Sequence, residues 1–223
     1  MNKSIRVTAL FSIILTIILL INLTVVQAFS VDKYADNPKN QRGFYDMQTV
    51  ARGQIFAGGT VLAQSTANED GIYSRSYPVD SPAWGPVTGY LSTQYGASQL
   101  EASQNNILNG TDDSLITSNF MDLITGEQPD GANVEVTIDP QLQQVAYDQL
   151  TQPGYEGAAV ALQPSTGKIL AMASSPSYNP NNIDDQWAQL QEQEGNPLLN
   201  HATQETLPPG SIFKIITTAA GLN

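Results

Sequence analysis

The sequence predicts an α+β fold behind a single membrane-spanning helix at the N-terminus. Residues 7–26 carry no charged side chain and are rich in Ile and Leu. Further along, short segments with strand-like alternation are mixed with segments whose apolar residues recur at helical spacing. The 223 residues carry a net charge of −12 and contain no Cys, which argues against nucleic-acid binding, disulfides and thiol catalysis.

As a helix, residues 7–26 span about 30 Å, the thickness of the hydrocarbon core of a bilayer. Lys3 and Arg6 precede this stretch, so the positive-inside rule places the N-terminus in the cytoplasm and the remainder outside the cell membrane. Residues 26–28, Val-Gln-Ala, also resemble a signal-peptide cleavage site. Because the apolar region of a signal peptide is usually about 7–15 residues long, the sequence favours an uncleaved, single-pass anchor.

The stretch from residue 30 to residue 156 begins with a polar linker up to residue 50. Gly58-Gly59, between apolar residues, indicates a β-hairpin. Beyond it, the pattern predicts strands over 73–79, 87–93 and 132–138, and helices over 98–108 and 114–124. Asp139 followed by Pro140 is typical of a helix N-terminus, and the spacing predicts that this helix buries Leu142, Val145, Ala146 and Leu150.

The last part of the chain is predicted to begin with a second hairpin, because apolar segments 158–162 and 168–174 flank turn residues 164–167. A loop over 176–182 and a short helix over 184–193 follow. Pro208, Pro209 and Gly210 then break the backbone. Ser211 opens an apolar run to residue 220, which predicts a buried helix with Ser211 in its first turn.

Ser211 and Lys214 are three residues apart, so on a helix their side chains lie on one face. A serine hydroxyl is a weak nucleophile until a base removes its proton. Burial among apolar side chains lowers the pKa of a lysine and allows it to act as that base. The pattern indicates a serine acyl-transfer site with Lys214 as general base. The plain alternative is a serine that starts a helix, followed by a surface lysine.

The same Ser-x-x-Lys spacing occurs twice more, at Ser30/Lys33 beside the polar linker and at Ser165/Lys168 in the predicted turn. Neither pair has a helix to bring its side chains together. His201 is the only histidine, lies in a polar segment and is not expected to be catalytic. No acidic spacing matches a calcium loop, and no thiolate metal site is available.

Five blocks, in order, resemble the N-terminal half of a class B penicillin-binding protein, closest to the penicillin-binding protein A group. They are Arg52-Gly53 with Ile55, Gly59 and Val61-Leu62-Ala63; Tyr95-Gly96 with Leu100-Glu101 and Leu108-Asn109-Gly110; Thr137-Ile138-Asp139 with Leu142-Gln143; Ala159 to Ala173 with Pro176 to Asn181; and Asn200, Ala202 and Pro209-Gly210-Ser211-Ile212-Phe213-Lys214. Ile212, His201 and Leu207 stand where this family usually has Thr, Arg and Tyr.

The resemblance implies three parts. Residues 1–29 are a cytoplasmic tip and transmembrane anchor, 30–156 a linker with a membrane-proximal α+β pedestal or dimerisation module, and 157–223 the start of a serine β-lactamase-like transpeptidase domain.

The family's site also uses a Ser-x-Asn and a Lys-Thr/Ser-Gly element. Neither follows Ser211 here. We therefore expect a truncated, N-terminal portion in which 30–156 can fold, whereas 157–223 is loosely ordered and does not acylate by itself.

The function implied by the resemblance is that of a peptidoglycan D,D-transpeptidase in cell wall synthesis. Ser211 would carry the acyl-enzyme, Lys214 would act as base, and the partners would be stem peptides ending in D-Ala-D-Ala, β-lactams and other cell-wall or division proteins. No metal or organic cofactor is implied. Two alternatives stay open: a non-catalytic membrane-anchored scaffold, and a penicillin-recognising lactamase or sensor. The long module before the nucleophile speaks against the last of these.

Overall fold

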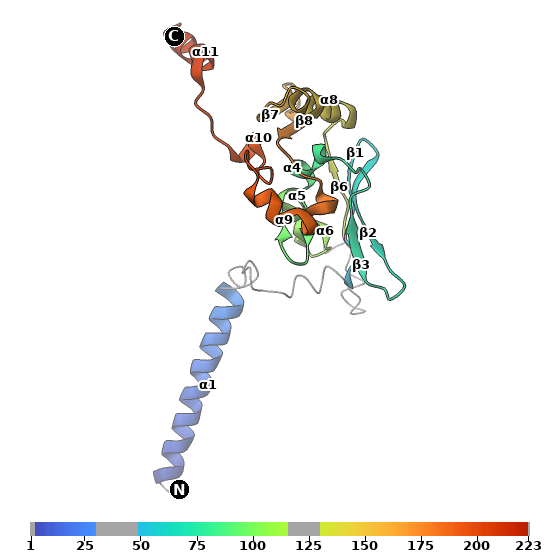
Figure 1. The fold of residues 1–223 in the computed structure, drawn as a ribbon. Helices are drawn as coiled ribbons and strands as arrows, with labels where there is room; N and C mark the ends of the chain where they lie inside the picture. The colour runs from blue at the N-terminus through green and yellow to red at the C-terminus, as the bar shows by residue number, and fades with distance from the viewer. Residues whose placement is uncertain (1–2, 30–48, 116–129, 223) are drawn as a thin grey trace. The chain divides into compact units, whose positions relative to one another are not determined.

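The structure, a computed structural model, describes residues 3–29, 49–115 and 130–222 and divides into two compact units, Met1–Asp46 and Met47–Asn223. The described part of the first unit is helix α1 (Lys3–Phe29), which is long and apolar enough to cross a membrane (Figure 1). Its three threonine hydroxyls each donate to the backbone carbonyl four residues earlier. These hydroxyls are therefore satisfied within the helix, as the interior of a bilayer requires.

A four-stranded sheet in the order β3-β2-β1-β6 begins the second unit. Its strands are β1 (Ile55–Ala57), β2 (Thr60–Ala67), β3 (Tyr73–Ser76) and β6 (Val134–Val136). β2 pairs antiparallel with both β1 and β3, whereas β6 runs parallel to β1. Gly58 and Gly59 have φ of 52° and 82°, values that glycine adopts without strain, and they confirm the first hairpin. The strands predicted over 73–79 and 132–138 are present but shorter.

The prediction of a strand over residues 87–93 is wrong. After the 3₁₀ turn η1 (Pro82–Trp84) the chain forms helix α4 (Gly85–Thr88), and only β4 (Leu91–Ser92) pairs as a strand, with β5 (Gly96–Ala97). Pro86 explains the difference, because it occupies the first turn of α4, where its fixed φ suits a helix and its missing N–H costs nothing. Gly89, with φ of 74°, ends the helix.

The helix predicted over 98–108 is confirmed in two pieces, α5 (Gln99–Ser103) and α6 (Asn105–Leu108). Gly110 has φ of 78°, in agreement with the stop signal that the sequence places there. The 3₁₀ turn η2 (Asp113–Leu115) begins where a helix over 114–124 is predicted. The rest of that predicted helix lies outside the described residues.

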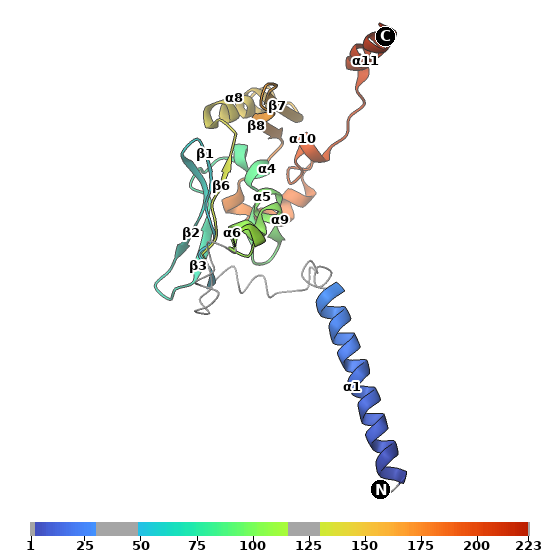
Figure 2. The ribbon, with the colours of Figure 1, turned by 180° about the vertical axis from the view of Figure 1, so that it is seen from behind.

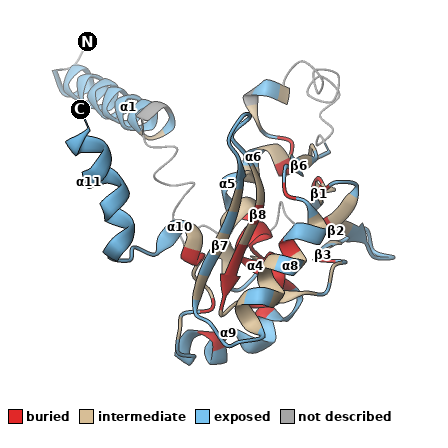
Figure 3. Cartoon of the chain, turned by 90° about the horizontal axis from the view of Figure 1, so that it is seen from above, coloured by how far each residue is buried: buried red, intermediate tan, exposed pale blue. Residues whose placement is uncertain are grey.

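The second hairpin is confirmed: β7 (Gly157–Gln163) and β8 (Lys168–Ser175) pair antiparallel around the predicted turn. β8 lies in the interior, with Ala171 and Ala173 fully buried, whereas β7 is half-buried or exposed (Figure 3). The 3₁₀ turn η3 (Pro180–Asn182) and helix α9 (Ile183–Glu192) follow, close to the predicted loop and helix.

Helix α8 (Pro140–Thr151) confirms the predicted cap but not the predicted buried face. Asp139 Oδ1 accepts two N–H groups of the first turn, each at 2.9 Å. Leu142 and Val145 are 38% and 56% exposed, so the prediction that both are buried is wrong. Gln143 is buried instead, because its side-chain amide donates to the carbonyl of Met172 on β8 and accepts the N–H of the same residue. These two hydrogen bonds with the backbone of β8 give the polar side chain of Gln143 the partners that it needs in the interior.

Two clusters of buried side chains hold the second unit together. The larger joins the sheet to α4, α6 and Ile138, two residues before α8, with Ile169 and Met172 of β8 packed against it. The smaller combines Tyr90 with Tyr178, Ile183 and Leu190. Figure 2 shows α4, α8 and β8 close together from behind. Because both clusters join residues before and after 157, the prediction that 157–223 is loosely ordered is wrong for residues 157–204.

Candidate active site

Ser211 lies in a 3₁₀ turn, η4 (Gly210–Ile212), which leads directly into helix α11 (Phe213–Gly221). Gly210 has φ of 53°, so the break before the serine uses a conformation that favours glycine. The N–H of Ile212 donates to the carbonyl of Pro209 at 3.2 Å and closes the turn. The predicted position of Ser211 in the first helical turn, one turn before Lys214, is therefore confirmed.

The environment of this helix differs from the prediction of a buried segment. Ser211, Lys214 and every other described residue of η4 and α11 are exposed (Figure 3). Ile215 and Ile216, which belong to the apolar run that was predicted to be buried, are themselves 72% and 60% exposed. The ammonium group of Lys214 therefore lies in solvent in this structure.

Within the described residues, the side chains of Ser211 and Lys214 form no hydrogen bond with each other. The backbone carbonyl of Lys214 instead accepts the side-chain hydroxyls of Thr217 and Thr218, at 3.0 and 2.7 Å. The structure therefore places Ser211 in η4 and Lys214 one turn later, in α11.

The Ser165/Lys168 pair lies in the turn between β7 and β8, as predicted. Gly167 has φ of 74°, and the hydroxyl of Thr166 donates to Gln163 Oε1 and accepts the N–H of Lys168. These bonds belong to a hairpin turn. Ser30 lies outside the described residues. Of the Ser-x-x-Lys pairs within the described residues, only Ser211/Lys214 is on a helix.

The segment that leads to Ser211 is fixed by the short helix α10 (His201–Gln204). His201 is buried, its N–H donates to Ser174 Oγ at 3.1 Å, and its Nδ1 lies 2.7 Å from Glu205 Oε2. Asn200 donates its side-chain amide to the carbonyl of Pro86 at 2.8 Å. Sequence reasoning missed this anchoring role of His201. The His201/Glu205 spacing of four residues was the available signal.

A buried charged cluster stabilises the sheet and α5. Glu101 is fully buried and pairs with Arg52 Nε at 2.8 Å and Arg75 Nε at 2.6 Å. Burial lowers the pKa of Arg52, with Glu101 acting in the opposite direction, and burial raises the pKa of Tyr77 beside it. The role of the cluster is structural. Within residues 3–29, 49–115 and 130–222, no three His, Cys, Asp or Glu side chains gather as a metal site.

Two family models match the chain. The penicillin binding protein A dimerisation domain matches residues 52–134, and the penicillin binding protein transpeptidase domain matches residues 157–223. The chain is 45% identical to peptidoglycan D,D-transpeptidase PbpA of Mycolicibacterium smegmatis over 100% of its own length and 48% of that protein. It is 43% identical to PbpA of Mycobacterium tuberculosis, with the same coverage.

Solved structures agree with these matches. The imipenem acyl-enzyme complex of penicillin-binding protein A from M. tuberculosis superposes with a TM-score of 0.72 at 44% identity, over 79% of this chain and 43% of that chain. Pseudomonas aeruginosa PBP2 superposes with a TM-score of 0.61 at 30% identity, over 78% of this chain and 39% of that chain. The chain thus spans about half the length of the curated relatives it matches.

Proposed function

Because the chain belongs to the penicillin-binding protein family, we propose that it supplies the membrane anchor, the pedestal module and the nucleophile segment of a peptidoglycan D,D-transpeptidase. The observation that carries the proposal is the transpeptidase match over 157–223. This match includes the one described Ser-x-x-Lys pair that lies on a helix. We also propose the division into 1–29, 30–156 and 157–223.

In the proposed reaction, Ser211 Oγ attacks the carbonyl of the penultimate D-alanine of a stem peptide, and Lys214 takes the hydroxyl proton. The bond to the terminal D-alanine breaks, and that residue leaves with its amine protonated. An amine of a second stem peptide then attacks the ester carbon, the bond between that carbon and Ser211 Oγ breaks, and Lys214 carries the proton lost by the amine back to Ser211 Oγ, which leaves the cross-link as an amide. β-Lactams would acylate the same oxygen. The solved penicillin-binding protein A of M. tuberculosis supports this step, because it was obtained as acyl-enzyme complexes with imipenem and penicillin G.

Lys214 must lose its solvent shell to act as base, because a hydrated ammonium keeps its proton. The exposed α11 does not provide that shielding. We therefore propose that the chain alone does not react with penicillin. The groups that cover α11 would come from the part of the relatives that lies beyond the match to this chain.

A chimera tests this proposal. Residues 1–223 are joined to the remaining half of M. smegmatis PbpA, and the product is incubated with a fluorescent penicillin. We expect covalent labelling that Ser211→Ala abolishes and Lys214→Ala slows by about 10²–10⁴-fold, the usual contribution of a general base. Ser165→Ala serves as the matched control and keeps full labelling. Unchanged labelling of the Lys214→Ala chimera would contradict the proposed base.

We further propose that the anchor leaves the N-terminus in the cytoplasm and residues 30–223 outside. Lys3 and Arg6 before the apolar stretch support this orientation. Outside the membrane, the second unit would meet stem peptides and other cell-wall proteins. A cleaved N-terminus would be revealed by the absence of residues 1–28 from the mature protein in N-terminal sequencing.

A further inference from the structure

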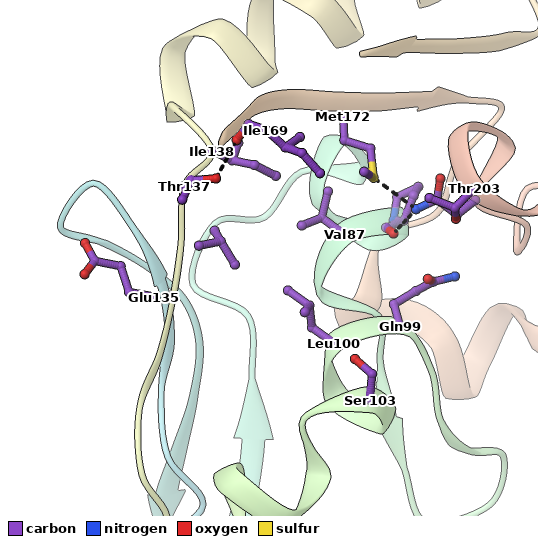
Figure 4. A pocket seen from close by; sticks show the side chains of 13 residues that line it. Val87, Gln99, Leu100, Ser103, Glu135, Thr137, Ile138, Ile169, Met172 and Thr203 are labelled. Atoms are coloured by element: carbon purple, nitrogen blue, oxygen red, sulfur yellow. Dashed lines mark hydrogen bonds between the residues drawn. The ribbon is translucent and has the colours of Figure 1, made fainter. Parts of the chain in front are cut away.

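A cavity of about 480 Å³ lies between the residues of the two family matches. β6 and the residues after it form one wall, and α5 lies across from them, with β8 crossing above in the view of Figure 4. The apolar lining consists mainly of Val87, Leu100, Ile138, Ile169 and Met172. The volume falls within the range of about 300–1,000 Å³ that is usual for binding pockets.

The wall formed by β6 is a free edge of the four-stranded sheet. The N–H of Val134 donates to the carbonyl of Gln54 at 2.8 Å, which fixes how β6 pairs with β1. Because alternate residues of a strand direct their backbone groups to opposite sides, Glu135 directs its N–H and C=O away from β1. Within the described residues, these two groups have no hydrogen-bond partner, and neither do the N–H and C=O of Thr137.

The cavity and the free edge of β6 beside it together form a groove. We propose that this groove binds an extended segment of a partner protein, which adds to β6 as a fifth strand. Unpaired backbone groups along a sheet edge are the template for such an addition. Strand addition combines main-chain hydrogen bonds with pockets for alternate side chains, and both are present here. A small apolar molecule would fill the cavity but leave the backbone groups of Glu135 unpaired.

The pleat of β6 determines which side chains the partner needs. Val134 and Val136 pack against the core, so a partner residue beside them points into the apolar cavity. Glu135 is exposed on the other face, whereas Thr137, also exposed, donates its hydroxyl to the carbonyl of Ile169 on β8 at 2.8 Å. Glu135 makes no ion pair with any described residue, and the chain carries a net charge of −12. Lys or Arg beside Glu135 would therefore gain cross-strand attraction, and the fitting segment alternates basic and apolar residues.

Because of the position of the groove, a bound segment would contact residues from both of the ranges that match family models, 52–134 and 157–223. Leu100 and Ser103 belong to the first match, whereas Met172, Asn200 and Thr203 belong to the second. Asn200 and Thr203 lie in the segment that leads to Ser211. A bound strand would therefore contact the edge of the sheet and also hold in place the segment that leads to Ser211.

The test uses the full chain in lipid nanodiscs and a synthetic eight-residue peptide that alternates Lys with Val and Leu. Fluorescence anisotropy measures binding, and hydrogen exchange measures protection of single amides. We expect saturable binding and slower exchange at the amide of Glu135. A second peptide carries N-methyl groups on the amides that would face β6, which removes those donors and keeps every side chain. It is expected not to bind.

Two pairs of variants separate groove binding from general charge attraction. Ser103→Trp fills the groove from the exposed face of α5, and Ala102→Trp places the same side chain one residue earlier, outside the lining. Glu135→Lys and Glu69→Lys change the net charge equally, at a groove residue and at a distant exposed turn. We expect Ser103→Trp to abolish binding and Ala102→Trp to leave it unchanged. Glu135→Lys should weaken binding more than Glu69→Lys.

Several outcomes would overturn the proposal. They are no binding of the unmodified peptide, equal binding to the two tryptophan variants, equal binding of the N-methylated peptide, or unchanged exchange at Glu135 in the presence of bound peptide. The last result would mean that the peptide binds at another acidic surface.

Discussion

Replacement of Glu101 by glutamine is expected to destabilise the second unit strongly. The carboxylate of Glu101 is fully buried between the guanidinium groups of Arg52 and Arg75, whose side chains are 2% and 3% exposed. The hydroxyl of Tyr77 lies 3.5 Å from the same carboxylate. Glutamine keeps the shape of the side chain but removes the negative charge, so two buried cations lose the group that balances them.

Loss of one partner from a buried ion pair costs about 3–5 kcal/mol. Both arginines keep other bonds here: Arg52 donates to the backbone carbonyl of Glu101 at 2.6 Å and to Asn105 Oδ1 at 2.8 Å, and Arg75 donates to the carbonyl of Gly53 at 2.7 Å. These bonds favour the lower end of the range, about 3 kcal/mol. For a unit of this size, each kcal/mol shifts Tm by about 2–4 °C, so we expect a decrease of roughly 6–12 °C.

The assay is thermal unfolding of the chain in nanodiscs, followed by tryptophan fluorescence, because Trp84 lies in the larger core cluster. Glu69→Gln, on the exposed turn between β2 and β3, is the matched control and should change stability by less than about 0.5 kcal/mol. If the Glu101→Gln chain melts within about 2 °C of this control, the reasoning about the buried cluster is refuted.

Three further predictions concern the helix cap, a surface carboxylate and the topology. Asp139→Ala removes the acceptor for two N–H groups of α8, so urea unfolding should show a loss of about 0.5–2 kcal/mol; no loss would mean that water replaces the cap. Hydrogen bonds from Asn179 and Asn181 lower the pKa of Asp80 from its ordinary value of 3.8, so the stability it contributes is present above that value and lost as pH falls through the lower folded pKa. Asp80→Asn should therefore flatten the acid limb of the stability curve below about pH 4, and an identical acid limb would disprove the linkage. Protease added to intact spheroplasts should digest residues 30–223, whereas complete protection would reverse the proposed orientation.

Local signals predicted much of the fold. Gly58-Gly59 specified the first hairpin because a positive φ at both turn residues is a property of the residues themselves. Asp139 specified the start of α8 because its carboxylate bonds to N–H groups only two and three residues away. Neither signal depends on the rest of the chain, and both predictions were confirmed.

Features that depend on distant residues were missed. The face of α8 was predicted from apolar spacing, yet Gln143 is buried because the backbone of Met172, 29 residues later, receives its amide. Glu101 drew no structural prediction, since its partner Arg52 lies 49 residues away. The spacing rule counts apolar residues and assigns no value to a polar side chain that finds a partner on another element.

In the candidate site, too, the local structure was predicted, whereas the features that depend on distant residues were not. The helical turn that holds Ser211 and Lys214 follows from Gly210 and the apolar run, and the structure contains it. Desolvation of Lys214 requires groups from other elements, and the described residues do not surround α11. The anchoring of the preceding segment by His201 also depends on a distant residue, Ser174 on β8.

Mass spectrometry of the penicillin-labelled chimera is the most direct test of the claim that Ser211 is the nucleophile. The labelled protein is digested and each peptide is searched for the added mass of the opened penicillin. We predict one adduct per chain, on the peptide that contains Ser211, and none on the peptide that contains Ser165. An adduct on Ser165, or on any residue of the half supplied by the relative, would contradict the account.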